Sequence, residues 1–214
     1  MEGASTTSGG GLRLIYGDNL RLSNPMSETH LQPGRPMRAD AVRNRQKLVA
    51  AAQETFAADG TSAPLEDVAE RAGVGIGTLY RHFPTRQALL EAVYVGEIEA
   101  MAQAAEELAD ADARDALASW FRQYVSFAAT KRALTEALLE EDADENVLAA
   151  CRTLLSDAGT GLIERAQAEG AVRPDVTFMD VARIVSGIAV SPSADDEQKE
   201  RMLQIVLDGL RASA

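Results

Sequence analysis

From Asp40 onward the sequence carries a helical pattern, and almost nothing in it favours a strand. The chain contains 38 alanines, and no segment alternates apolar and polar residues over the length of a strand. Glycine and proline interrupt the pattern at intervals, at residues 60–64, 73–77, 84, 170–174 and 191–193. We therefore predict an all-α fold, with helices near 41–58, 65–72, 76–82, 86–108, 113–130, 132–140, 145–168, 177–190 and 195–212.

Residues 1–37 differ from the rest of the chain. They are rich in Gly, Ser, Thr, Asn and Pro and have no sustained period, so we expect a disordered tail. Met26 and Met37 are alternative start positions that would remove most of it. The tail lacks the basic and apolar regions of a signal peptide, and no apolar run approaches the roughly 20 residues that cross a bilayer. We expect a cytoplasmic protein with no membrane partner.

The composition also excludes several kinds of site. Cys151 is the single cysteine, so neither an internal disulfide nor a multi-cysteine zinc site can form. His30 and His82 lie far apart in the sequence, which argues against a histidine metal centre. No P-loop, nucleophile elbow or dinucleotide-binding glycine pattern is present. We expect no metal, no cofactor and no enzymatic activity.

The net charge of −12 is unevenly distributed along the chain. Residues 38–95 carry seven Lys and Arg against seven Asp and Glu, whereas residues 96–214 carry 11 against 23. A protein this acidic cannot bind DNA through its overall charge, so any contact with DNA must come from a local basic face on the neutral segment. The simpler interpretation is that the acidic surface only keeps the protein soluble.

The segment from Pro64 to Val93 has the pattern of two short helices joined by a turn. Pro64 suits the first turn of a helix, and Leu65, Val68 and Ala69 follow at the spacing of one buried face. Gly73 is placed for the left-handed residue that ends this helix. In the second helix, Leu79 and Phe83 point inward and Thr78, Arg81 and His82 point outward, until Pro84 stops it. Such a pair can hold a recognition helix in the major groove of DNA.

Three stretches resemble the amino-terminal domain of the tetracycline-repressor (TetR) family. They are residues 45–56 (RQKLVAAAQETF), residues 68–74 (VAERAGV) and residues 77–83 (GTLYRHF). The resemblance implies a three-helix head that binds operator DNA, followed by a divergent helical domain that dimerises and binds a small effector. We accordingly assign residues 1–37 to the tail, residues 38–93 to the DNA-binding domain and residues 94–214 to the ligand-binding and dimerisation domain.

The resemblance also implies roles in DNA binding for single residues. Thr78 corresponds to a position that reaches a base or a nearby phosphate, Tyr80 and His82 correspond to positions that hold phosphates, and Arg86 replaces a lysine that commonly contacts the DNA backbone. Each residue also has an interpretation without DNA contact: Tyr80 would be half-buried against the first helix, and His82 would be an ordinary surface histidine. The expected DNA-contacting set is Arg43, Lys47, Ser62, Ile76, Thr78, Tyr80, Arg81, His82 and Arg86.

Two departures from the family pattern bear on this set. Ala63 and Pro64 stand where many relatives have a Ser or Thr that opens the second helix, so Ser62 or Thr61 would have to replace that phosphate contact. Gly75 stands where a serine is usual, and the next residue is the apolar Ile76. Its side chain either touches a thymine methyl group or packs against the turn.

The aromatic residues of the second half are concentrated on one helical face. Trp120, Phe121, Tyr124 and Phe127 recur at helical spacing, which is typical of a core; the resemblance implies an effector cavity in this region. Both interpretations stay open. The pocket interpretation predicts an apolar or aromatic effector and a lining of Met101, Trp120, Tyr124, Phe127, Cys151 and Leu155.

Two apolar stripes near the carboxyl end predict a dimer interface, with packing inside one chain as the alternative. The expected interface residues are Phe178, Val181, Val185, Ile188, Met202, Ile205 and Val206. Taken together, the sequence predicts a homodimeric transcriptional regulator, most simply a repressor that a small effector releases from a palindromic operator on double-stranded DNA. The alternative is a helical ligand- or partner-binding module without DNA binding.

Overall fold

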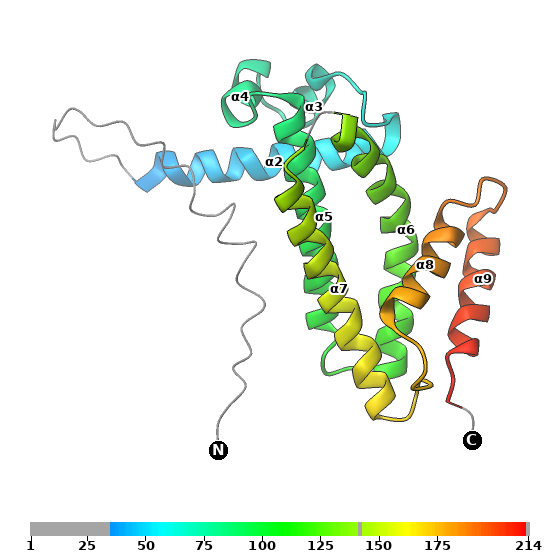
Figure 1. Cartoon of the computed structure of the whole chain (residues 1–214). Helices are drawn as coiled ribbons and strands as arrows, with labels where there is room; N and C mark the ends of the chain where they lie inside the picture. Colours follow the sequence, from blue (N-terminus) through cyan, green and yellow to red (C-terminus); the bar gives the residue numbers. More distant parts are fainter. Residues whose placement is uncertain (1–34, 141–142, 213–214) are drawn as a thin grey trace. The chain divides into compact units, whose positions relative to one another are not determined.

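The computed structural model describes residues 35–140 and 143–212, with side chains from Asp40 onward, and these residues form eight α-helices (Figure 1). The chain divides into two compact units, residues 1–43 and 44–214, and the account below concerns the second unless stated. None of the helices described is long and apolar enough to cross a membrane. The helices are α2 (Arg35–Asp59), α3 (Leu65–Arg71), α4 (Ile76–His82), α5 (Arg86–Glu107), α6 (Ala113–Glu140), α7 (Glu145–Ala168), α8 (Phe178–Ala189) and α9 (Asp196–Gly209).

The all-α prediction is confirmed, and two of the predicted boundaries are wrong. Helix α2 begins at Arg35, so residues 35–37 are helical; residues 1–34 of the expected tail lie outside the described part. The two helices predicted at 113–130 and 132–140 are the single helix α6. No Gly or Pro interrupts this segment, and Leu134 and Leu138 continue its buried face, so nothing ends the helix near residue 131.

The turn between α3 and α4 forms as predicted, around a left-handed glycine. Gly73 has a φ of +69°, its N–H donates to the carbonyl of Glu70, and the N–H of Val74 donates to the carbonyl of Ala69. This paired arrangement satisfies carbonyls at the end of α3 and fixes the direction in which the chain leaves it. Pro64, expected in the first turn of α3, is instead the residue that precedes the helix, with a φ of −58°.

Helix α5 is buried on every side near its start. Between Leu89 and Val95 all residues except Glu91 are buried, and a helix turns through all directions within such a span. Helices α6 and α7 pack against α5, α8 packs on α6, and α9 packs on α8 (Figure 1). On another side of α5, α2 approaches at Gly96, where Val49 and Gln53 lie 3.7 Å from the position of a Cβ atom.

An aromatic cluster joins α6 to α8 in the core of the bundle. Trp120 lies with its ring centre 5.4 Å from that of Tyr124 and 5.8 Å from that of Phe178, and Phe121 packs against all three. The indole N–H of Trp120 donates to the backbone carbonyl of Met101 at 2.9 Å, which satisfies its one polar group. The cluster therefore fixes α5, α6 and α8 against one another.

Helix α7 approaches α8 closely enough that only a glycine fits at the contact. A Cβ atom added to Gly159 would overlap the ring of Phe178, whereas one added to Gly161, two residues away on α7, would meet nothing within 4 Å. Because Phe178 belongs to the aromatic cluster, its ring has no room to withdraw.

We expect Gly159→Ala to destabilise the protein by about 1–3 kcal/mol, because the added methyl group overpacks the core. Gly161→Ala is the matched control and should be neutral or stabilise by up to about 1 kcal/mol, since alanine favours the helix. Urea denaturation at a fixed protein concentration measures both. Equal stability of the two variants would contradict the close contact.

Candidate functional site

Helix α4 presents a short outward face. Helix α4 packs on α3, Leu79 and Phe83 are buried, and Arg81 lies on the opposite side, exposed. Thr78 and His82 are half-buried on its flanks, and Tyr80 is exposed, with 47% of its surface accessible. Four of the five predicted contact residues of this helix are thus accessible from outside, and the fifth, Ile76, is described below.

Gly77 is a further member of this face that the sequence analysis did not assign. A Cβ atom there would meet nothing within 4 Å, so this residue exposes the backbone of α4 rather than accommodating a close neighbour. The flat surface lies one residue from Thr78. A flat position on a helix of this kind allows another molecule to approach its backbone closely.

Two contacts fix the orientation of α4 and α3. The guanidinium of Arg45, on α2, lies 5.2 Å above the ring centre of Phe83, a cation–π contact. Arg71 of α3 forms an ion pair with Glu54 of α2 at 3.4 Å. The outward face of α4 is therefore held at a defined angle to α2, as a surface that recognises a rigid partner requires.

Arg86 does not extend toward solvent as the resemblance implied. Its guanidinium is half-buried and donates one hydrogen bond to the carbonyl of Thr61 at 2.8 Å and another to that of Ala63 at 2.7 Å. These carbonyls precede α3 in a loop and are free to accept, and the fork of an arginine matches two neighbouring acceptors. The structure therefore gives Arg86 a role in fixing the loop, and its contact with DNA stays a prediction.

The loop that Arg86 fixes presents Ser62. Gly60, with a φ of +84°, turns the chain out of α2, and the N–H of Ala63 donates back to the Gly60 carbonyl at 3.1 Å. Ser62 is exposed between these two residues. Its hydroxyl is available for the contact that an exposed serine before a helix can make with a phosphate.

The remaining predicted DNA contacts are on or near the first helices. Lys47 is exposed on α2 and Ile76 is half-buried at the start of α4. Arg43 lies in the first compact unit, where it pairs with Asp40 of the same helix. The half-buried Ile76 has part of its side chain on the turn and part accessible, so both of its predicted roles remain predictions.

The residues expected to line an effector pocket are packed in the core. Met101, Trp120, Tyr124, Phe127 and Leu155 are each no more than 5% exposed. Cys151 is fully buried, and burial raises the pKa of its thiol to about 11, which keeps it protonated near neutral pH. The structure thus favours the core interpretation of the aromatic stripe, and none of the six lines either of the two cavities described next.

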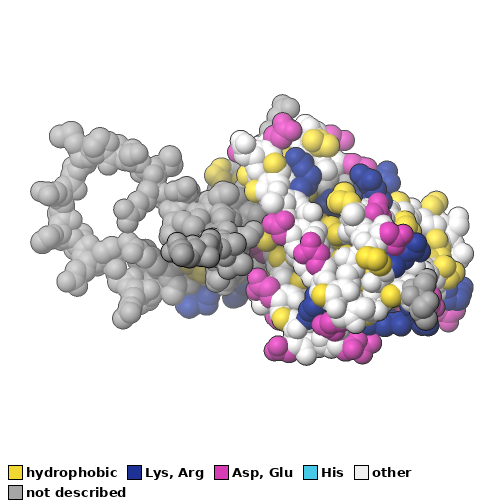
Figure 2. Space-filling view, turned by 60° about the horizontal axis from the view of Figure 1, so that its bottom comes forward, with side chains coloured by type: hydrophobic (Ala, Val, Ile, Leu, Met, Phe, Trp, Pro, Cys, Tyr) yellow, Lys and Arg dark blue, Asp and Glu magenta, His cyan; other side chains and the backbone are white. Residues whose placement is uncertain are grey.

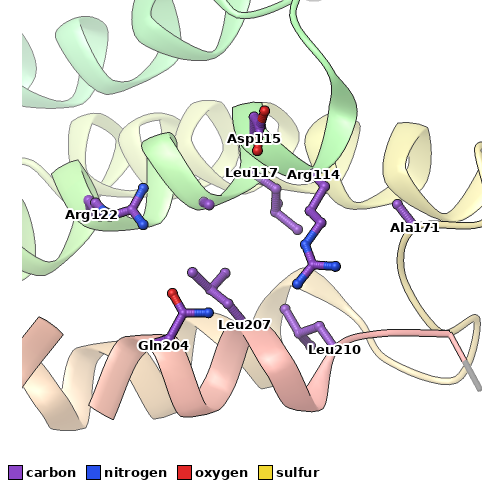
Figure 3. A pocket seen from close by; sticks show the side chains of 9 residues that line it. Arg114, Asp115, Leu117, Arg122, Ala171, Gln204, Leu207 and Leu210 are labelled. Carbon is purple, nitrogen blue, oxygen red and sulfur yellow. The ribbon is translucent and has the colours of Figure 1, made fainter. Parts of the chain in front are cut away.

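One cavity lies between the start of α6 and the end of α9 and has a volume of about 320 Å³. Figure 3 shows Arg114 extending from α6 toward Leu210 at the end of α9, whereas Asp115 points away from α9. Arg114 and Arg122 both line the cavity and already have carboxylate partners: Arg114 pairs with Asp208 at 3.5 Å and Arg122 with Glu200 at 2.9 Å.

A second cavity, of about 450 Å³, lies between the later half of α6 and the end of α8. The sequence analysis did not find it, because it lies beyond the last aromatic residue of the stripe, where the residues of α6 that line it are mostly polar. Ala128, Lys131, Arg132, Thr135 and Glu136 line it on α6, and Ser186, Gly187 and Val190 line it on α8 and at its end.

Most of the predicted α8 interface is buried inside the chain. Phe178, Val181, Val185 and Ile188 are at most 4% exposed and face α6, so their assignment to a dimer interface is wrong. An amphipathic helix needs one apolar face for its own bundle, and these residues supply it. The α9 residues differ: Ile205 is 72% exposed, and Met202 and Val206 are half-buried. Two further apolar side chains are exposed on α8, Met179 and Ile184.

Charged groups of both signs lie on the face drawn in Figure 2. Figure 2 shows Lys and Arg side chains interspersed with Asp and Glu over one face of the protein. Within the described ranges, no group of three or more His, Cys, Asp or Glu could hold a metal ion.

Comparisons with known proteins agree with the helix-turn-helix geometry. Residues 48–93 match the profile of bacterial regulatory proteins of the tetR family, and residues 112–212 match that of the SbtR-like transcriptional regulator C-terminal domain. The transcriptional regulator UidR of Escherichia coli K12 is 24% identical over 183 residues, which cover 82% of this chain and 93% of UidR.

Two solved structures are similar over nearly their whole length. The TetR transcriptional regulator SCO0520 from Streptomyces coelicolor is 38% identical, with a TM-score of 0.71, and the match covers 79% of this chain and 99% of SCO0520. A TetR regulatory protein from Mycobacterium vanbaalenii is 35% identical, with a TM-score of 0.68, over 82% of this chain and 99% of that protein.

We expect Arg86→Lys to lower the free energy of unfolding by about 1–3 kcal/mol, because lysine keeps the charge but cannot bond both carbonyls at once. Arg81→Lys, at an exposed position on α4, is the control and should change stability by less than about 0.5 kcal/mol. Chemical denaturation measures both. If Arg86→Lys leaves stability unchanged, the loop is fixed by other contacts.

Proposed function

Because this chain belongs to the TetR family of bacterial transcriptional regulators, we propose that it is a homodimeric repressor that a small-molecule effector releases from a palindromic operator. In its family the amino-terminal helix-turn-helix binds DNA and the carboxy-terminal helical domain binds a ligand. We place the DNA-binding domain at residues 38–93 and the effector and dimer domain at residues 94–214. Since its partner would be chromosomal DNA, we place the protein in the cytoplasm.

The observation that carries this proposal is the outward face of α4. It combines a central arginine, an exposed tyrosine, a threonine and a bare backbone at Gly77 on a helix whose angle is fixed by Arg45 and Arg71. A helix inserted into the major groove reads base edges with its most outward side chains, while flanking residues contact phosphates. The alternative of a module without DNA binding has no such support.

Local charge would have to overcome the acidity of the whole chain. The net charge of −12 repels a duplex at a distance, and the acidic surplus lies in residues 96–214. Lys47 and Arg81 are both exposed on the helix-turn-helix segment, so they can neutralise phosphates where the two molecules touch. Such an arrangement weakens binding to random DNA and makes affinity depend on the specific fit.

Helix α5 supplies a direct route between an effector and the DNA-binding elements. Burial raises the pKa of Tyr94 on α5, and the nearby hydroxyl of Thr135, which lines the second cavity, lowers it. Arg86 lies eight residues earlier on the same helix, about 12 Å along its axis, and holds the loop before α3. We propose that an effector shifts α5 and, through Arg86, the position of α3 and α4.

The functional test distinguishes residues that contact bases from residues that contact phosphates. It measures the binding of variants to DNA from upstream of the chain's own gene and to a random duplex. Thr78→Ala should cost about 1–3 kcal/mol on the specific fragment and leave the random duplex unaffected, because base contacts carry specificity. Lys47→Ala should weaken both and reduce the salt dependence by about one unit per half-site, because it removes a phosphate contact. Fluorescence anisotropy at several salt concentrations measures all of these.

Lys199→Ala is the control, since it removes a lysine from α9, outside the helix-turn-helix, and should change neither affinity. If Lys47→Ala alters the preferred sequence while Thr78→Ala lowers affinity uniformly, the proposed docking is wrong. A wild-type protein that binds no duplex would overturn the repressor function.

The proposed dimer interface is now the outer surface of α8 and α9. TetR-family regulators dimerise, and on these two adjacent helices Ile184 is 54% and Ile205 is 72% exposed. Large apolar side chains exposed on neighbouring helices are typical of a surface that a partner covers. A two-fold dimer would also match the symmetry of a palindromic operator.

We expect Ile205→Glu and Ile184→Glu to give folded monomers, because a dimer would bury the new charge without a partner. Leu139→Glu is the matched control: Leu139 is 66% exposed on α6, and its variant should remain dimeric. Val185→Glu should instead unfold the protein, since Val185 is fully buried in the chain. Analytical ultracentrifugation and circular dichroism separate these outcomes, and a dimeric double variant of Ile184 and Ile205 would place the interface elsewhere.

A further inference from the structure

The cavity between α6 and α8 contains a cation without a counter-ion. Within the described residues, the ammonium of Lys131 has neither a hydrogen-bond partner nor an ion-pair partner, although the side chain lines the cavity. The other two charged residues of the lining neutralise each other, since Arg132 pairs with Glu136 at 2.8 Å. The cavity therefore has one uncompensated positive charge.

The surroundings of Lys131 add to this positive character. Burial lowers the pKa of Lys131, and the charge of Arg152 on α7 lowers it further. Both main causes make the charged ammonium less favourable in the empty cavity. An anion placed beside Lys131 would remove that penalty, whereas a second cation would increase it.

The rest of the lining suits a small molecule with an apolar part. The volume of the cavity, about 450 Å³, lies within the range of about 300–1,000 Å³ that is typical of small-molecule sites. Ala128 and Val190 provide apolar surface, and the hydroxyls of Thr135 and Ser186 provide hydrogen-bonding groups. The hydroxyl of Tyr124 lies 3.5 Å from that of Ser186, at the edge of the aromatic cluster.

The cavity between α6 and α9 lacks this feature. Its arginines, Arg114 and Arg122, already pair with Asp208 and Glu200, so an entering anion would have to displace a carboxylate from each. The two cavities thus differ in their uncompensated charge, and that difference favours the cavity of Lys131 as an anion site.

We infer that the cavity between α6 and α8 binds small organic acids, with the carboxylate on Lys131 and the hydrocarbon part on Ala128 and Val190. This inference rests on the proposed function in one respect only, namely that the bound acid is the effector. It names the class of that effector as anionic and amphiphilic, where the sequence predicted an apolar or aromatic molecule. Thr135 then lies next to the ligand and close to Tyr94 of α5.

The experiment uses three probes with the same eight-carbon chain and different head groups: octanoate, 1-octanol and octylamine. Isothermal titration calorimetry at pH 7 measures their binding to the full chain in the absence of DNA. We expect octanoate to bind the wild-type protein more tightly than 1-octanol, and octylamine to bind most weakly. Lys131→Met, which keeps the length of the side chain and removes its charge, should weaken octanoate about tenfold or more and leave 1-octanol unchanged.

Two further variants control for changes in folding and in overall charge. Lys199→Met removes a lysine from α9 and should leave octanoate binding unchanged, and Lys131→Arg should retain most of it. The thermal unfolding of each variant shows that the comparison is between folded proteins. The inference is overturned if octanoate and 1-octanol bind equally, if no probe binds, or if Lys131→Met binds octanoate as the wild type does.

Failure of this inference is distinguishable from failure of the proposed function. Binding of octanoate is measured without DNA, so its result does not depend on whether the protein recognises an operator. Addition of octanoate to the complex with upstream DNA then tests whether the bound acid is the effector. Release of DNA from the wild-type protein, but not from Lys131→Met, supports that role. Octanoate that binds through Lys131 without releasing DNA would keep the anion site and overturn its role as the effector site.

Discussion

The burial of helix α5 on all sides is the constraint on which the rest of the structure depends. A helix that is apolar in every direction near its start cannot lie on a surface, so other helices must cover it completely. Helices α6 and α7 cover its bundle side, and α2 approaches it at Gly96, where Val49 and Gln53 lie 3.7 Å from the position of a Cβ atom. The helix-turn-helix and the ligand-binding bundle therefore share one rigid element.

This shared element gives a physical basis for regulation. Arg86, the first residue of α5, bonds two carbonyls before α3, and Tyr94, two turns later, lies close to Thr135 at a cavity. A displacement of α5 must change at least one of these contacts, because hydrogen bonds weaken steeply with distance and angle. An effector that binds the two arrangements with different affinity would then change the affinity for DNA by the same factor.

Three surfaces of the molecule differ in the kind of interaction that they offer to a partner. The outward face of α4 carries few charges and depends on shape and a small number of accessible side chains. The cavity of Lys131 depends on one uncompensated charge among apolar and hydroxyl groups. The outer surface of α8 and α9 depends on exposed isoleucines. Each surface uses a different interaction, so that substitutions in one should affect the others only through the fold.

The sequence by itself determined those features that depend on neighbouring residues. The helices, the left-handed turn at Gly73, the inward positions of Leu79 and Phe83 and the membership of the TetR family could all be predicted, because periodicity, turn chemistry and motif spacing are local. The continuity of α6 could have been predicted as well, since its segment contains no glycine or proline.

Only the tertiary structure decided which partner each face and each side chain meets. An apolar stripe looks the same whether it packs in its own chain or against another, so Val185 was assigned to an interface although it is buried against α6. A guanidinium can bond a phosphate or two carbonyls, and only the position of the loop at Thr61 and Ala63 decides the partners of Arg86. The same holds for Lys131, whose lack of a counter-ion depends on side chains brought together from separate helices.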